Sequence, residues 1–251
     1  MAENFNNNYS RYYDLLYADK DYKAESDYIA KMIQRIHPNA KNIIELGSGT
    51  GNHAALLCKN GFKVTGLERS VDMVGLAKAK SIKGFTPIVA DVANFDISQK
   101  FDVAISLFHV VSYLTSNDSL ISCFRSVHRH LNTKGIFIFD AWYSPAVSYQ
   151  KPETRIKRME DDTLKITRIT EPEIHYNTNV VDVNFEIIIQ NKASLFTEVF
   201  REKHPIRHFS ISEIELLANL VDFKLISAEE FLTGKQPGND TWGVCFVLQK
   251  N

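Results

Sequence analysis

The residues best suited to chemistry stand at the ends of short apolar runs. Three glycines, Gly47, Gly49 and Gly51, follow the apolar run of residues 43–46, and helix-forming residues come directly after them. A strand, a tight turn and a helix in this order are typical of the first switch point of a doubly wound α/β sheet. Glycine suits such a turn because it reaches left-handed dihedrals and lets a ligand lie against bare main chain. The pattern therefore predicts a ligand site, although a purely structural turn is the alternative.

Carboxylates accompany this turn and indicate which ligand it suits. Glu45 lies two residues before the first glycine, where it would repel a pyrophosphate and attract a cation. A dinucleotide fingerprint would place its third glycine where this chain has Asn52. A second apolar run, residues 62–67, ends in Glu68, a carboxylate that can accept both hydroxyls of a ribose. Arg69 beside it keeps an NADP site open as an alternative.

Two further polar residues follow the next strand-like runs. Asp91 comes after residues 85–90, and His109 comes after residues 101–108. Open α/β sheets bind ligands at the carboxyl ends of their strands, so the His109 side chain is expected near the ligand, whereas Asp91 taken by itself would be a residue that caps a loop. Because an imidazole titrates near neutral pH, we expect His109 to act as a general base; a packed histidine is the alternative.

Residues 45–51, 67–74 and 89–92 resemble, in order, the motif series of the class I SAM-dependent methyltransferases. The resemblance covers residues 10 to 140 well and the remainder loosely. It is strongest to small-molecule enzymes, namely sugar N-methyltransferases acting on nucleotide-linked amino sugars and glycine N-methyltransferase. His109 and Val111 depart from the sugar N-methyltransferase pattern. The resemblance implies S-adenosylmethionine (SAM) as cofactor and a small-molecule acceptor methylated on nitrogen or oxygen.

The resemblance also implies a role for several residues. Asp91 would receive the adenine amino group, Met73 would pack on the adenine, and Leu107 or Phe108 would offer a main-chain group to the methionine moiety. Tyr17 and Tyr22 lie in a segment that resembles the lid folded over the cofactor. The expected cofactor-binding set is Tyr17, Tyr22, Glu45, Gly47, Gly49, Gly51, Glu68, Arg69, Met73, Asp91, Val92 and Leu107.

Composition limits the partners, the location and the metal sites that the chain can have. The chain has 251 residues, of which 44% are hydrophobic, so it can bury a full core. Its net charge is −1 with both signs interspersed, so we expect no nucleic-acid partner. No apolar run is long enough to span a membrane and the start is not of signal type, so a cytoplasmic protein is expected. The three cysteines are too scattered for a disulfide framework or a zinc site, and no metal is expected.

The segment order predicts one α/β domain built on a seven-stranded Rossmann-like sheet. We divide it into a lid and helix (1–37), a SAM-binding core (38–144), an insert (145–208), and a final helix with a β-hairpin (209–251). The insert shows partial alternation, turn clusters and no helical period, which predicts an antiparallel sheet. This sheet could cover the acceptor, form the surface of a homodimer, or do both.

Three other functions stay open from the sequence alone. A non-catalytic scaffold of the same fold would bind SAM and turn over no acceptor. An NADP-dependent oxidoreductase would bind NADPH instead. Methylation of a protein or an RNA is the third, although the lack of a basic patch argues against RNA.

Overall fold

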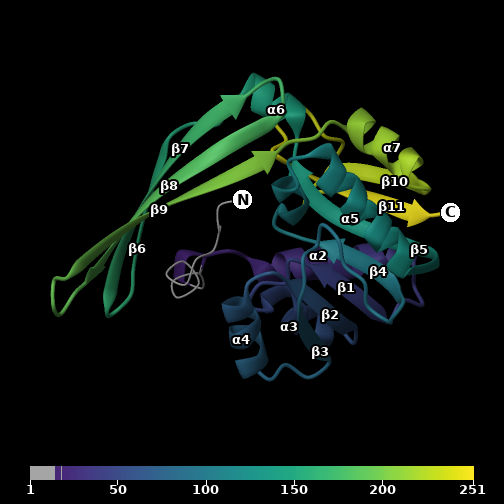
Figure 1. The fold of residues 1–251 in the computed structure, drawn as a ribbon, viewed down its shortest axis with the longest axis horizontal. Coiled ribbons are helices and arrows are strands. Elements are labelled where there is room, and N and C mark those ends of the chain that lie inside the picture. The colour runs from purple at the N-terminus through teal and green to yellow at the C-terminus, as the bar shows by residue number, and fades with distance from the viewer. Residues whose placement is uncertain (1–14, 18) are drawn as a thin grey trace.

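A seven-stranded sheet forms the centre of the computed structural model, which describes residues 15–17 and 19–251 (Figure 1). The strand order is β10-β11-β5-β4-β1-β2-β3, with β1 to β5 parallel and β11 antiparallel to both β5 and β10. The strands are β1 (Asn42–Leu46), β2 (Lys63–Glu68), β3 (Phe85–Val89), β4 (Phe101–Ser106), β5 (Leu131–Trp142), β10 (Phe223–Glu230) and β11 (Gly243–Lys250). The predicted doubly wound α/β sheet with a terminal hairpin is confirmed.

Helices cover both faces of this sheet. The helices are α2 (Tyr22–Ile36), α3 (Asn52–Lys59), α4 (Val71–Ala79), α5 (Asn117–His130) and α7 (Ile211–Leu220). Successive strand side chains point to opposite faces, so Ile43 packs with α2 and α3 while its neighbour Ile44 packs with α5 and α7. None of the described helices is long and apolar enough to cross a membrane.

The neighbouring strands β1 and β4 form the switch point of the sheet. The chain leaves β1 through the glycine turn into α3 on one face, and it leaves β4 through the short 3-10 helix η1 (Val110–Tyr113) into α5 on the other. Loops that diverge in this way leave a crevice at the carboxyl ends of the strands. The ligand site is therefore expected between the glycine turn and η1.

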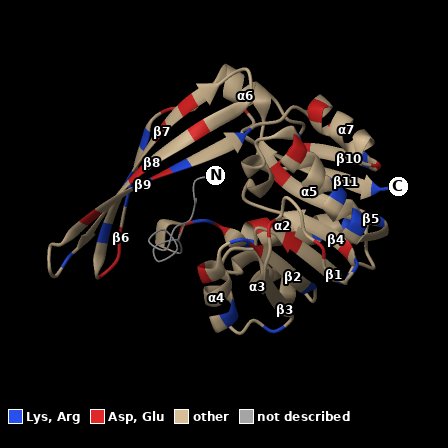
Figure 2. Cartoon of the chain, in the orientation of Figure 1, with Lys and Arg blue, Asp and Glu red and all other residues tan. Residues whose placement is uncertain are grey.

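The insert forms a second sheet of four antiparallel strands, as predicted. They are β6 (Arg155–Glu160), β7 (Leu164–His175), β8 (Val180–Asn191) and β9 (Thr197–Arg207), in that order. The sheet extends as an arm away from the main sheet (Figure 1). Acidic and basic residues are interspersed over both sheets (Figure 2).

The root of the insert differs from the sequence prediction, which gave residues 145–208 no helix. A short helix, α6 (Ser144–Tyr149), precedes β6, because Pro145 suits a helix start and the next two residues are apolar and buried. Val147 of this helix packs with Val181 and Ile206 of the inserted sheet and against Trp142 at the end of β5. The arm is therefore anchored to the main sheet through its own small core.

Candidate active site

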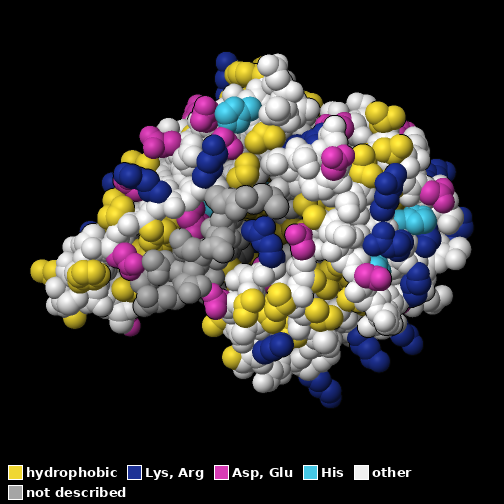
Figure 3. All heavy atoms as spheres, in the orientation of Figure 1, with side chains coloured by type: hydrophobic (Ala, Val, Ile, Leu, Met, Phe, Trp, Pro, Cys, Tyr) yellow, Lys and Arg dark blue, Asp and Glu magenta, His cyan; other side chains and the backbone are white. Residues whose placement is uncertain are grey.

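A cavity of about 750 Å³ lies at the carboxyl ends of the central strands and reaches the inserted sheet. Figure 3 shows the surface hollowed between the inserted sheet and the main body. Most of the predicted residues line the cavity: Tyr17, Tyr22, Gly47, Gly49, Glu68, Arg69, Met73, Asp91, Val92, Leu107 and His109. Residues from segments far apart in sequence are thus brought to one space.

The glycine turn supplies bare main chain to this cavity. Gly47 and Gly49 both have left-handed backbones, with φ of 69° and 54°. A Cβ on Gly47 would lie 2.5 Å from a methyl carbon of Val110, so η1 packs directly on the turn. Among the described residues, only the sulfur of Met73 would lie within 4 Å of a Cβ on Gly49, at 3.8 Å. The space above Gly49 is therefore the place where a ligand can approach the backbone.

Glu68 is fixed by the turn that it faces. Its Oε2 accepts a hydrogen bond from the amide of Gly49 at 3.1 Å, and its Oε1 accepts one from the amide of Ser70 at 2.8 Å. Each carboxylate oxygen has a further lone pair, so Glu68 can still accept two hydroxyls of a ligand. Met73, Asp91 and Val92 line the cavity with it, in a set suited to a nucleoside.

Glu45 and Gly51 lie outside the cavity lining, so direct contact of either with the cofactor stays a prediction. Glu45 is 1% exposed, and its Oε1 lies 3.8 Å from Nδ1 of His53. Burial, followed by the charge of Glu68, raises the pKa of Glu45 to about 8. Gly51 begins α3, and a Cβ there would lie 2.6 Å from the ring of Phe85.

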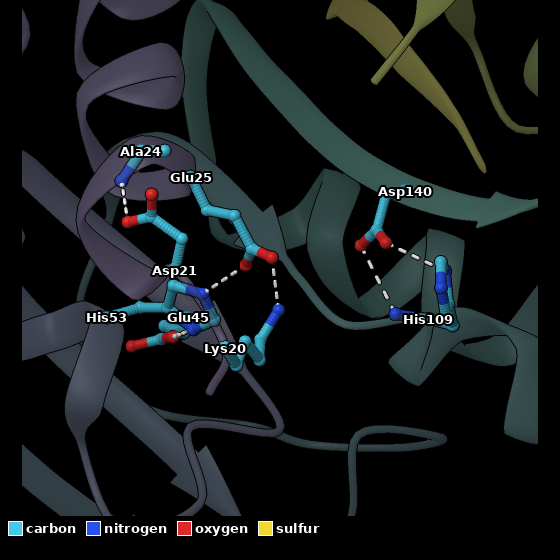
Figure 4. Close-up of polar contacts among 8 residues, drawn as sticks. All are labelled: Lys20, Asp21, Ala24, Glu25, Glu45, His53, His109 and Asp140. Carbon is cyan, nitrogen blue, oxygen red and sulfur yellow. Dashed lines mark hydrogen bonds and ion pairs between the residues drawn. The ribbon is translucent and has the colours of Figure 1, made fainter. Parts of the chain in front are cut away.

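A charged network that the sequence did not predict borders the glycine turn (Figure 4). His53 Nε2 lies 2.7 Å from Oε2 of Glu25, and Lys20 forms an ion pair with the other oxygen of Glu25. Burial opposes ionisation of Glu25, but the hydrogen bond from His53 and the charge of Lys20 outweigh it and lower the pKa of Glu25. The network ties the start of α2 to the glycine turn.

The predicted lid residues Tyr17 and Tyr22 reach both sides of the cavity. The ring of Tyr17 meets Phe108 edge to face with centroids 5.0 Å apart, and Tyr22 meets His53 at 4.9 Å. The Tyr17 hydroxyl also accepts a hydrogen bond from Arg168 of the inserted sheet, at 3.4 Å. The other tyrosines of the N-terminal segment, at positions 9, 12 and 13, lie outside the described residues.

His109 is held by a buried aspartate (Figure 4). Its Nδ1 lies 2.7 Å from Oδ2 of Asp140, and its amide donates to Oδ1 of the same side chain at 3.2 Å. Asp140 is 1% exposed; burial opposes its ionisation, yet the charge and hydrogen bonds of His109 lower its pKa. Phe108 and His109 both have left-handed backbones, with φ of 65° and 60°, a costly conformation that clusters at functional sites.

Asp140 is a residue that the sequence analysis missed, although the sequence carries a signal for it. An apolar run in β5 ends in this lone carboxylate, beside the end of β4 in the sheet. The reasoning that selected Glu68, a carboxylate at the end of an apolar strand, applies to it. His53 and Glu25 had no such signal, because 28 positions separate them and only the packing of α2 on α3 brings them together.

The inserted sheet forms the opposite wall of the cavity. Strand β9 contributes Lys203, His204, Pro205 and Ile206, and β8 contributes Val183 and Phe185. Beside this wall, Glu173, His175 and Asp182 form a cluster of metal-ligand type. Lys203 Nζ lies 2.6 Å from Oδ2 of Asp182, so a cation of the chain already neutralises the carboxylate.

Comparisons with known proteins agree with this geometry. Residues 43–135 match a family described as a methyltransferase domain. The chain is 26% identical over 228 residues to the dTDP-3-amino-3,4,6-trideoxy-alpha-D-glucopyranose N,N-dimethyltransferase of Streptomyces venezuelae, covering 90% of this chain and 92% of the relative. Residues 43–135 therefore form a methyltransferase domain.

Solved structures show the same fold over nearly the whole chain. A SAM-dependent methyltransferase from Clostridium acetobutylicum superimposes with a TM-score of 0.81 at 22% identity, over 96% of each chain. A sugar N-methyltransferase from Streptoalloteichus superimposes with a TM-score of 0.82 at 21% identity, over 95% of this chain and 92% of that one. The inserted sheet is thus part of a fold that other methyltransferases have.

Proposed function

We propose that this methyltransferase transfers a methyl group from SAM to the nitrogen of a small molecule, an amino sugar linked to a nucleotide. The observation that carries the proposal is the position of His109: an imidazole held on buried Asp140 lines the same cavity as the glycine turn and the inserted sheet. The relative from Streptomyces venezuelae, named as acting on a dTDP-linked amino sugar, supports this acceptor class.

The residues at the glycine turn fit the cofactor. Glu68 would accept the ribose hydroxyls, and Gly49 leaves room for the nucleoside beside Met73. Tyr17 and Tyr22 would exclude water from the methionine end, where the phenol groups can still form hydrogen bonds. When bound, SAM supplies a methyl group on a very good leaving group, so alignment alone can contribute roughly 7–11 kcal/mol.

His109 would take the proton that an amine must lose before it attacks. Nδ1 faces Asp140 at 2.7 Å, so Nε2 would be the nitrogen that takes the proton. Asp140 stays ionised and would stabilise the imidazolium once His109 accepts the proton. A general base positioned in this way contributes roughly 10²–10⁴-fold.

A homodimer formed through the arm is part of the same proposal. Large apolar side chains are exposed on the strands and turn of the inserted sheet, among them Ile156, Leu195, Phe196 and Val199. Figure 3 shows apolar groups gathered at the tip of the arm. Strands β6 and β9 are the two edges of this sheet and offer unpaired backbone groups to a second copy. Sedimentation of wild type and Phe196→Asp tests this: a dimer that the substitution dissociates is expected, and a wild-type monomer contradicts it.

An acceptor panel tests the proposed reaction. Methyl-labelled SAM would be incubated with dTDP-linked amino sugars, free amino sugars, small amines and the matching hydroxy sugars. We expect label on the nitrogen of a nucleotide-linked amino sugar. Binding of SAM without any labelled product would instead support a scaffold protein, and label on a hydroxyl would reassign the acceptor atom.

A further inference from the structure

A chain of three polar side chains joins the core to the inserted sheet at the wall of the cavity. The Tyr113 hydroxyl lies 2.8 Å from Nδ1 of His204, and Nε2 of His204 lies 2.9 Å from Oε2 of Glu202. Tyr113 is the last residue of η1, and the other two lie on β9. Tyr113 and His204 line the cavity whereas Glu202 does not, so the chain leads from the cavity wall into the sheet.

The charge states of Glu202 and His204, both buried, determine the direction of each hydrogen bond between these side chains. His204 is 2% exposed, and the side chain of Glu202 is 3% exposed. An ionised carboxylate can only accept, so Nε2 of His204 must donate to it. A neutral imidazole that carries its proton on Nε2 has a lone pair on Nδ1. With His204 in this neutral form, the Tyr113 hydroxyl donates to its Nδ1.

Tyr113 keeps the proton that this arrangement requires. Burial, followed by the charges of Tyr17 and Glu202, raises the pKa of Tyr113 above its ordinary value. A phenol has one proton and two lone pairs, and here the proton is directed toward the inserted sheet. Since Tyr113 lines the cavity, its oxygen would then offer a lone pair to a donor group of a ligand.

We propose that the Tyr113 oxygen binds the acceptor's nitrogen through an N–H group, and that His204 and Glu202 are positioning residues that keep its hydroxyl proton turned away. The proposal rests on the proposed function and specifies its acceptor as an amine that binds in the protonated form. His109 precedes η1 and Tyr113 ends it, so one short helix presents both the group that holds the nitrogen and the group that takes its proton.

The charge of Glu202, at the far end of this chain of hydrogen bonds, favours a cation over a neutral hydroxyl as the group that binds Tyr113. No lysine or arginine in the described part of the chain forms an ion pair with Glu202, and its Oε1 has no hydrogen-bond partner there. Arg168 of β7 is directed to the Tyr17 hydroxyl and the ring of Phe185 instead, and Lys203 pairs with Asp182. A chain of hydrogen bonds ending in an uncompensated carboxylate polarises the Tyr113 oxygen, which an ammonium group would neutralise.

Nitrogen NMR of the histidine-labelled full chain tests the hydrogen-bond direction without any acceptor. His204→Gln identifies the resonances by their loss. We expect His204 to be neutral with its proton on Nε2 at pH 7, and its Nδ1 resonance to shift in Tyr113→Phe. A proton on Nδ1 of His204, whether in the other tautomer or in the imidazolium, would overturn the proposal.

Kinetics with the amine that the acceptor panel identifies, and with its hydroxy analogue, test the choice of nitrogen. Tyr113→Phe should lower kcat/KM for the amine by at least about tenfold, and Glu202→Gln by at least about threefold, with SAM affinity kept. The loss for the hydroxy analogue should be smaller. His175→Gln is the matched control, because it removes another histidine paired with a carboxylate on the same sheet, at 2.6 Å, outside the cavity lining.

Equal losses for the amine and the hydroxy analogue would show that Tyr113 only shapes the wall, and unchanged kinetics would remove it from the site. Both outcomes overturn the proposal. If the panel contains no amine that is methylated, the proposed function fails, and the NMR result still decides the hydrogen-bond direction by itself.

Discussion

The side chain of Asp140 contacts His109 through both of its oxygens, one at the ring nitrogen Nδ1 and one at the main-chain amide. This pair joins the ends of β4 and β5, two neighbouring strands of the sheet. The two contacts fix both the position of the His109 backbone and the orientation of its ring. A base held in this way needs no rearrangement when an acceptor arrives.

Asp140→Asn should therefore lower kcat by at least about tenfold while SAM affinity stays unchanged. The amide cannot stabilise an imidazolium, although it keeps the shape of the carboxylate. Steady-state kinetics and calorimetric titration with SAM measure the two effects. Asp222→Asn is the matched control, since Asp222 lies 3.8 Å from His128 at the surface. A variant with full kcat would leave alignment as the only catalytic effect.

Glu68→Ala should weaken SAM binding by about 1.5–3 kcal/mol, the value of a hydrogen bond to a charged group. This corresponds to roughly a 10- to 150-fold rise in Kd. Titration with SAM or its demethylated product measures the change. Asp72→Ala removes an exposed carboxylate four positions away and should have no effect. Wild-type affinity in the Glu68 variant would place the ribose elsewhere.

Alanine substitutions at Gly47 and Gly49 separate a structural role from a ligand-binding role. Both residues have positive φ, so each substitution should cost about 1–2 kcal/mol of stability. Gly47→Ala also meets Val110 and should lose about 1–3 kcal/mol more, whereas Gly49→Ala should fold and lose SAM affinity. Denaturant unfolding and SAM titration on the same samples measure both properties. Equal stability of the two variants would contradict the close packing of η1 on the turn.

Glu45 should make stability depend on pH between its ordinary pKa of 4.5 and its folded pKa of about 8. The folded state holds the proton more tightly, so the free energy of unfolding falls as pH rises through this window, by up to about 1.4 kcal/mol per unit. Glu45→Gln should remove this slope in unfolding experiments at pH 6 and pH 8.5. An unchanged slope would assign the pH dependence to other groups.

The sheet and its insert were predictable because their signals are local. Apolar runs, the glycine turn, and the polar residues that close each run place Glu68, Asp91 and His109 at one sheet edge, since parallel strands end together. The residues of the SAM-binding core that line the cavity were therefore predictable from the sequence.

The parts that were not predictable depend on how separate units pack. Glu45 was selected because it lies two residues before the first glycine, yet its side chain is buried beside His53. Tyr113 and His204 are 91 positions apart, and only the orientation of the arm against η1 brings them to 2.8 Å. No periodicity in either segment carries information about that orientation.

A crystal structure with the demethylated product of SAM tests the central assignment of the cavity most directly. We expect the ribose hydroxyls within hydrogen-bond distance of Glu68, the adenine beside Met73 and Asp91, and the sulfur facing the space between His109 and the inserted sheet. A nucleoside bound against β9, or a sulfur directed away from His109, would contradict this assignment and the reaction proposed from it.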